Sequence, residues 1–275
     1  MSAPDNLQLL AKFRFALMDM DGVLYRGNTA LPGLVELFAF LEKNRIGYLL
    51  LTNNASMSAQ DYSQKLLKMG VKVDAEKIIT SSFATAQYLK QIAPEGGGIY
   101  VVGMEALRRA LFGLSDSSGP FYFDDKNPRF VVQGADFNLV YATLKRACLL
   151  IRAGARFIAT NGDPAFPSEE GLLPGAGSIS ALLQTATGQK PFVIGKPEPT
   201  MYKLALEMLG ATLQETVMIG DNLITDIEGA RRMGIPSILL LTGVTSAEDI
   251  AQDPGAADFV FSGLPELIAS WQGAL

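Results

Sequence analysis

The stretch Phe15-Ala-Leu-Met-Asp19-Met-Asp21-Gly22 joins an apolar run to two acidic residues. A second stretch of the same kind, Val217-Met-Ile-Gly220-Asp221, lies far along the chain. Apolar runs of this length that end in an acid are typical of buried strands with carboxylates at their carboxyl ends. In an open parallel sheet ligands bind at that edge. We therefore expect both acidic stretches to lie on one sheet edge.

Strand-like and helix-like segments alternate almost throughout the chain, which predicts an α/β fold. The expected strands are 15–18, 48–51, 99–102, 130–132, 156–159, 192–194, 217–219, 237–241 and 259–261. The expected helices are 33–43, 59–69 with Ser58 as its cap, 81–91, 105–111, 139–152, 178–187, 200–209, 225–233 and 264–271, and 115–128 is expected to be a polar loop.

The middle of the chain separates the two acidic stretches. If they act together, the two ends of the chain must form one domain. The simplest geometry is a catalytic core made from 1–83 and 190–275, with 84–189 inserted as a smaller α/β cap.

Composition excludes several function classes. The chain has 275 residues and no histidine, so Ser-His-Asp triads, Cys-His pairs and His-ligated zinc are impossible. Its net charge of −5 offers no general attraction to nucleic acid or to anionic membranes. The single cysteine, Cys148, cannot form an internal disulfide, and we interpret it as a small buried apolar residue. No apolar run is long enough to span a bilayer, so we expect a cytoplasmic protein.

The acids at the first strand end are suited to phosphoryl transfer. A carboxylate can attack phosphorus and form an acyl phosphate that water then hydrolyses. Asp19 is the candidate nucleophile, and Asp21 can protonate the leaving group and later accept a proton from water. Such a cluster of acids needs a cation, and the oxygen donors favour Mg²⁺. Asp19, the carbonyl of Asp21 and the side chain of Asp221 would hold it, while Asp226 orients a bound water or Asp221.

Two further motifs complete a phosphate site. Thr52-Asn53-Asn54 follows the second expected strand with a hydroxyl and two amides. Lys196, between Gly195 and Pro197, can offset phosphate charge and keep Asp19 ionised. Each motif alone has an ordinary structural interpretation as a turn, a cap or a surface lysine. Their joint position at strand ends favours a functional site.

These motifs resemble those of a known family. Asp19-Met-Asp21-Gly22-Val-Leu, Thr52-Asn-Asn54, Gly195-Lys196-Pro197 and Gly220-Asp221-Asn-Leu-Ile-Thr-Asp226 are similar to the four motifs of haloacid dehalogenase (HAD) superfamily phosphatases. Tyr25-Arg-Gly-Asn-Thr-Ala-Leu-Pro-Gly33 and Pro174-Gly-Ala-Gly-Ser178 resemble its NagD-like branch, which includes p-nitrophenylphosphatases. The resemblance implies a Rossmann-like core with a doubly wound parallel sheet and a large α/β cap.

The resemblance also implies residue roles. Asp19 would be the nucleophile, Asp21 the acid/base, Thr52 and Lys196 phosphate contacts, and Asp221 a Mg²⁺ ligand. Asp226 would support the metal, with assistance from Asn53 or Asn222. The cap would sense the organic part of the substrate through the loop that carries Asn161 and Asp163, although an ordinary Asn-Gly-Asp turn is the alternative there.

The leading function is therefore a Mg²⁺-dependent phosphatase acting on a small phosphorylated metabolite, with no nucleic-acid or membrane partner. One alternative is a phosphomutase, but only 22–51 lies between the first two motifs, too short for the helical cap of such relatives. Another is a non-catalytic protein, which would typically have lost Asp19 or Asp21. A homodimer through cap residues such as Phe121 and Phe123 is a further expectation, although both could equally belong to the core.

Overall fold

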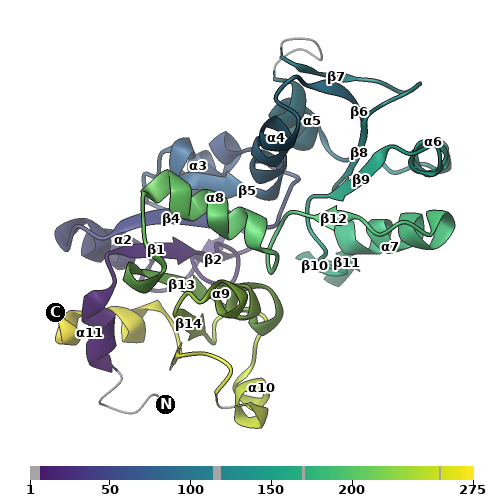
Figure 1. The fold of residues 1–275 in the computed structure, drawn as a ribbon. Coiled ribbons are helices and arrows are strands. Elements are labelled where there is room, and N and C mark those ends of the chain that lie inside the picture. The colour runs from purple at the N-terminus through teal and green to yellow at the C-terminus, as the bar shows by residue number, and fades with distance from the viewer. Residues whose placement is uncertain (1–6, 114–118, 169–170, 254) are drawn as a thin grey trace. The chain divides into compact units, whose positions relative to one another are not determined.

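The computed structural model describes residues 7–113, 119–168, 171–253 and 255–275. They form two compact units, one within 1–52, 59–79 and 196–275 and the other within 53–58 and 80–195 (Figure 1). The sequence prediction placed the insertion at 84–189, so the second unit extends further in both directions. Its first helix begins at Ser81 with Thr80 as its N-cap, whose hydroxyl accepts a hydrogen bond from the Phe83 N–H over 3.1 Å.

A six-stranded sheet organises the first unit. Its strands are β1 (Phe15–Met18), β4 (Gly47–Thr52), β5 (Ile78–Thr80), β13 (Thr216–Gly220), β14 (Ser237–Leu240) and β15 (Phe259–Phe261). Their order is β15-β14-β13-β1-β4-β5, which is the Rossmann order, and β1 pairs in parallel with both β13 and β4. The chain reverses its direction across the sheet at β1. This reversal puts the ends of β1, β4 and β13 side by side.

Helices cover this sheet, and most of them lie in the connections between its strands. They are η1 (Gln8–Lys12), α2 (Leu34–Lys43), α3 (Ala59–Lys68), η2 (Ala75–Lys77), α8 (Pro199–Leu209), η3 (Leu213–Glu215), the π-helix η4 (Leu223–Ile227), α9 (Glu228–Met233), α10 (Ala247–Gln252) and α11 (Leu264–Ala274). Figure 1 shows α8 and α9 together in front of the sheet. Elsewhere Trp271 of α11 is fully buried and packs against Phe13 and Phe40, with ring centroids 6.2 and 5.5 Å away.

The second unit contains its own parallel sheet, in the order β12-β9-β8-β6-β7. Its strands are β6 (Gly97–Val102), β7 (Phe121–Phe123), β8 (Phe130–Gln133), β9 (Arg156–Ala159) and β12 (Phe192–Val193), and its helices are α4 (Ser81–Ile92), α5 (Glu105–Phe112), α6 (Tyr141–Arg152) and α7 (Ala176–Thr187). Counted along the chain, this is the flavodoxin-like order. The α/β class and the Rossmann-like core are thus as predicted.

Several elements differ from the sequence prediction. The expected loop 115–128 contains strand β7, although 115–118 lies outside the described residues. Only Phe121 of β7 is buried. A strand of three residues with polar segments around it gives too weak a sequence pattern to be predicted. Four short strands and one strand of the core sheet were also not predicted: β2 (Tyr25–Arg26), β3 (Thr29–Ala30), β10 (Ala165–Ser168), β11 (Gly171–Pro174) and β5. Helix α10 was missed as well. Cys148 is half-buried rather than buried, and it packs at the edge of the second unit's core.

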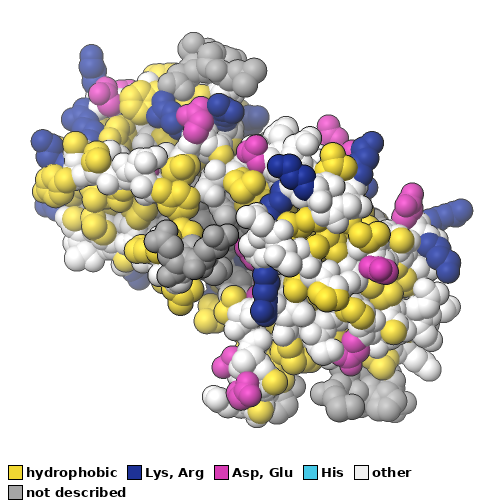
Figure 2. Space-filling view, turned by 180° about the vertical axis from the view of Figure 1, so that it is seen from behind, with side chains coloured by type: hydrophobic (Ala, Val, Ile, Leu, Met, Phe, Trp, Pro, Cys, Tyr) yellow, Lys and Arg dark blue, Asp and Glu magenta, His cyan; other side chains and the backbone are white. Residues whose placement is uncertain are grey.

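Two surface features are relevant to possible partners: helices that could cross a membrane, and basic residues gathered on the face drawn in Figure 2. No helix of the described ranges is long and apolar enough to cross a bilayer. Figure 2 shows Lys and Arg side chains interspersed with acidic and apolar ones on the face it draws. That distribution agrees with the net charge of −5.

Candidate active site

The carboxyl edge of the first unit's sheet carries the predicted acids. Asp19 follows β1, and its N–H continues the ladder by donating to the Ile219 carbonyl over 2.9 Å. Asp221 follows the neighbouring strand β13, and Thr52 ends β4 on the other side of β1. The sheet order therefore assembles in one place what the sequence separates.

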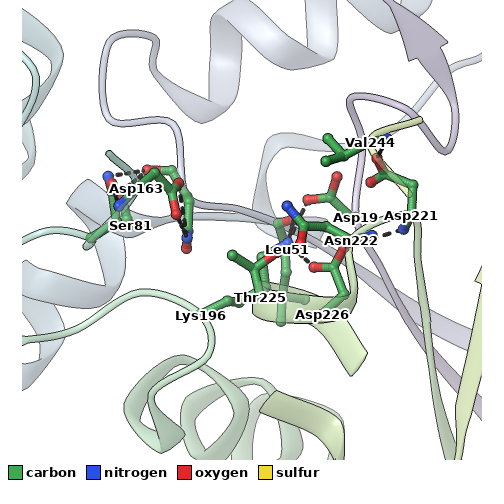
Figure 3. Close-up of polar contacts among 12 residues, drawn as sticks. Asp19, Leu51, Ser81, Asp163, Lys196, Asp221, Asn222, Thr225, Asp226 and Val244 are labelled. Atoms are coloured by element: carbon green, nitrogen blue, oxygen red, sulfur yellow. Dashed lines mark hydrogen bonds and ion pairs between the residues drawn. The ribbon is translucent and has the colours of Figure 1, made fainter. Parts of the chain in front are cut away.

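Lys196 lies among these acids (Figure 3). Its Nζ donates to Asp19 Oδ1 over 2.5 Å and to Asp226 Oδ1 over 2.6 Å, and a 3.4 Å contact reaches the Leu51 carbonyl. Only 2% of Lys196 is exposed. Burial opposes its charge, but the carboxylates of Asp19 and Asp226 outweigh burial and raise the pKa of the ammonium. The ammonium of Lys196 is thus stabilised by the two carboxylates beside it.

Asp226 is held from both sides. Its Oδ2 accepts the backbone N–H groups of Asp221 and Asn222, each over 3.2 Å, while its Oδ1 binds Lys196. A Cβ at Gly220 would lie 2.2 Å from the Asp226 Cβ, so only glycine fits there. Asn222 uses its side chain as the N-cap of the π-helix, accepting the Ile224 N–H over 2.9 Å. Asp226 and Asn222 thus hold the loop around Asp221 in place through these hydrogen bonds.

Asp221 lies at the centre of three loops. Its Oδ2 accepts the Val244 N–H over 2.7 Å, and its carbonyl accepts the Thr245 N–H over 3.0 Å. Cβ atoms at Gly22 and Gly243 would come within 2.5 and 1.8 Å of its carboxylate. Burial and the charge of Asp226 raise the pKa of Asp221 to about 7. The loop after β14 was not singled out from the sequence, although its Thr-Gly pair after an apolar run was a usable signal.

Asp19 is also buried, and its surroundings favour a second cation. Burial raises the pKa of its carboxyl well above the ordinary value, against the opposing effect of the Lys196 ammonium. Oxygens of Asp19, Asp221 and Asp226 lie within 4.8 Å of one another. Three buried carboxylates around one ammonium leave an excess of negative charge. Such a donor set fits a hard divalent cation such as Mg²⁺, which prefers carboxylate oxygens.

Asp21 lies in the turn that follows Asp19. Gly22 adopts a φ of +89° and donates its N–H to the Tyr25 carbonyl over 2.7 Å, which closes the turn. Partial loss of hydration raises the pKa of Asp21, while the ammonium of Lys65 opposes this shift. Lys65 was not predicted; its Nζ lies 3.8 Å from the centroid of the Tyr25 ring. A carboxyl with a raised pKa suits the role of a proton donor.

The remaining predicted residues have other partners. Thr52 is buried, and its side chain forms a hydrogen bond with the side chain of Tyr62. Asn54 accepts the N–H and hydroxyl of Ser56, so it shapes a local turn.

Asn53, Asn161 and Asp163 form a cluster of their own. The Asn53 amide donates to both oxygens of Asp163 over 3.1 Å, and the Asn53 carbonyl accepts from Asn161 over 2.7 Å and from Ser81 over 2.6 Å. The loop after β9, which carries Asn161 and Asp163, is thus hydrogen-bonded to Asn53.

Comparison with known proteins identifies the family. Models described as haloacid dehalogenase-like hydrolase and HAD-hydrolase-like match residues 16–114 and 193–267. The 5'-nucleotidase YutF of Bacillus subtilis is 37% identical over 252 residues, which cover 92% of this chain and 96% of that protein. The chain is a haloacid dehalogenase-like hydrolase.

Further relatives of this hydrolase are phosphatases. An acid sugar phosphatase of Staphylococcus saprophyticus is 34% identical, over 94% of this chain and 98% of that protein. The crystal structure of 4-nitrophenylphosphatase from Thermotoga maritima has a TM-score of 0.89 and 38% identity, covering 95% and 98% of the two chains. The predicted membership of the NagD-like, p-nitrophenylphosphatase branch is thereby confirmed. The chain is an enzyme, a HAD-type phosphatase.

Proposed function

We propose that this phosphatase hydrolyses phosphate monoesters of small metabolites through a phosphoaspartyl intermediate on Asp19. The observation that carries the proposal is the contact of Lys196 Nζ with both Asp19 and Asp226, at 2.5 and 2.6 Å. An attacking carboxylate must be ionised, and a buried carboxylate needs a permanent cation beside it. Lys196 supplies that cation where β1 ends.

The proposed reaction has two displacements. An oxygen of Asp19 forms a bond to phosphorus while the bond from phosphorus to the leaving oxygen breaks, and Asp21 gives that oxygen a proton. Water then attacks the same phosphorus and passes its proton to Asp21. The bond to Asp19 breaks, so inorganic phosphate leaves, Asp19 is again a carboxylate and Asp21 is again a carboxylic acid.

We propose Mg²⁺ as the cofactor. Asp19, Asp221 and the carbonyl of Asp21 would hold the ion, with Asp226 and Asn222 keeping the Asp221 loop in place. Bound Mg²⁺ supplies positive charge that offsets the phosphoryl oxygens. Thr52, Asn53 and Asn54 would contribute polar contacts to the phosphate from the end of β4.

The substrate class is proposed by analogy with the relatives. The printed names of the relatives include a 5'-nucleotidase, an acid sugar phosphatase and a 4-nitrophenylphosphatase. We propose a small, soluble phosphate ester of the nucleotide or sugar type. A panel of such esters, assayed with Mg²⁺ and again in excess chelator, tests this. Hydrolysis that persists undiminished in chelator would contradict the metal role, and a panel without any turnover would contradict the reaction.

The second unit is proposed to select the substrate, with Asn161 and Asp163 as the residues concerned. Asp163 holds the Asn53 amide through both carboxylate oxygens, so a change there reaches the segment next to Thr52. Asp163→Ala is expected to alter relative kcat/KM among esters by about 1–3 kcal/mol in transition-state terms. Asp163→Asn, which keeps the shape, is the matched control. A uniform effect on every ester would assign this loop a structural role only.

We also propose a homodimer through the second unit. Phe121 is only 2% exposed and belongs to the core, whereas Phe123 is 37% exposed. Larger exposed fractions occur at Tyr141 (80%) and Leu172 (77%), and we propose that both side chains take part in the dimer interface. Light scattering should report a dimer that the pair Tyr141→Lys and Leu172→Lys converts to a monomer. A monomeric unmodified protein would refute this proposal.

A further inference from the structure

A groove lies at the amino ends of two neighbouring strands of the second unit. Arg156 is the first residue of β9 and Phe192 the first of β12, and both line the groove. Arg152, at the end of α6, and Lys190, in the loop before β12, line it as well. Its volume is about 630 Å³, which is within the range of small-molecule sites.

This groove is distinct from the loop that carries Asn161 and Asp163. That loop follows the carboxyl end of β9, whereas the groove adjoins its amino end. The four steps from Arg156 to Thr160 span about 13 Å at about 3.3 Å per residue. A ligand in the groove would therefore use side chains other than those proposed to select the phosphate ester.

The groove is positively charged. Three of its lining residues are basic, Arg152, Arg156 and Lys190, and none is acidic. Among the described residues no acid forms an ion pair with any of the three. In a chain of net charge −5, three cations without acidic partners form a local site for an anion.

Both arginines are held in place. Arg152 Nη1 donates to the Ala186 carbonyl over 2.9 Å, and Arg156 Nη2 donates to the Tyr88 hydroxyl over 2.6 Å. Each bond uses one of the five donors of a guanidinium. An arginine fixed in this way loses little conformational freedom when it binds phosphate oxygens.

An aromatic surface adjoins the cations. The rings of Tyr88 and Phe192 stack 4.7 Å apart at 10°, and Arg156 Cζ lies 5.7 and 5.6 Å from their centroids. Phe192 is 40% exposed although Tyr88 is stacked on it. A large exposed aromatic beside fixed cations offers a stacking surface for a planar ring that carries anionic groups.

We infer that this groove binds a nucleoside diphosphate, with its phosphates on Arg152, Arg156 and Lys190 and its base against Phe192. Three cations match the charge of a diphosphate, and the ring accounts for the exposed aromatic. An extended nucleic acid fits poorly, because such a strand needs a continuous basic surface.

Calorimetric titration with ADP in excess chelator tests the inference. The double variant Arg156→Gln and Lys190→Gln should bind ADP at least tenfold more weakly than the unmodified protein. The control is Lys90→Gln with Lys145→Gln, which removes the same charge from exposed positions on α4 and α6 of the same unit and should bind ADP normally. Rates of 4-nitrophenyl phosphate hydrolysis should be the same in all three proteins, which separates this groove from the active site.

The base contact has its own test. Phe192→Leu should weaken ADP binding severalfold and leave pyrophosphate binding unchanged. Arg152→Gln, which leaves the aromatic pair and Arg156 intact, is the second variant if the double variant is unfolded by circular dichroism. Absence of ADP binding, equal binding in the double variant, equal loss in the control, or Phe192→Leu without effect on ADP would each overturn the inference.

Discussion

At the scale of single residues, the site is an arrangement of three buried carboxylates around one ammonium. Lys196 binds Asp19 and Asp226, while the carboxylate of Asp221 accepts the Val244 N–H. Breaking a buried ion pair by removing one partner leaves uncompensated charge, which is strongly destabilising. The site therefore affects both catalysis and stability.

The first prediction concerns Lys196. Lys196→Met should lower the free energy of unfolding by about 3–5 kcal/mol, because it leaves Asp19 and Asp226 buried without their cation. Adding Asp226→Asn to this variant should recover part of the lost free energy of unfolding, because it removes one buried negative charge that has no cation beside it. Denaturant titration in chelator measures both effects. A double variant less stable than Lys196→Met would show that the pair does not act through charge.

The second prediction concerns pH. The folded-state pKa of Asp221 is raised from 3.8 to about 7, so the folded protein binds this proton more tightly than the unfolded chain does. The stability contributed by that proton is present at low pH and is lost as the pH rises through about 7. In chelator, Asp221→Asn should therefore raise the melting temperature at pH 8 more than at pH 5. The exposed control Asp253→Asn should show no such difference between the two pH values. Equal shifts of the melting temperature at pH 5 and pH 8 for Asp221→Asn would contradict the prediction.

The third prediction separates the acid from the nucleophile. Asp21→Asn should slow hydrolysis of an alkyl phosphate more than that of 4-nitrophenyl phosphate, whose leaving group needs little protonation. The comparison of kcat/KM for the two esters measures this difference. Equal losses on both would exclude Asp21 as the general acid.

At the scale of elements, α11 closes the core of the first unit. Trp271 is fully buried between Phe13 and Phe40, and its indole nitrogen has no hydrogen-bond partner in the described structure. Trp271→Ala should therefore cost about 3–5 kcal/mol through lost packing. Trp271→Phe should cost much less, because the ring is kept and an unpaired N–H is removed. Thermal unfolding of the two variants decides this; equal losses would mean that packing is not the cause.

Long apolar strands and amphipathic helices were predictable from sequence, and short elements were not. The strands at 15–18, 156–159 and 259–261 have the predicted bounds, because each is a run of mainly apolar residues between polar segments. By contrast, β7 buries one of its three residues, and β10 and β11 pair only with each other. The expected helix 225–233 is instead a π-helix at 223–227 followed by α9 at 228–233, and Asp226 within the π-helix accepts the N–H groups of Asp221 and Asn222.

At the scale of the whole molecule, the sheet order brings distant residues together. Asp19 and Lys196 contact each other although the whole second unit lies between them in sequence. The strand-end motifs made this contact predictable. The partners of Asn53 and Asn54 were not predictable, because amides at a strand end can bond to a ligand, a turn or another loop with equal ease.

The central claim is that Asp19 becomes phosphorylated during turnover. The direct measurement is acid quenching of the enzyme during hydrolysis of 4-nitrophenyl phosphate, followed by peptide mass mapping. One phosphoryl group should appear on the peptide that contains Asp19. In Asp19→Asn that group should be missing, and kcat should fall by about four orders of magnitude or more. Near-normal turnover by Asp19→Asn, or a phosphoryl group on another residue, would contradict the mechanism.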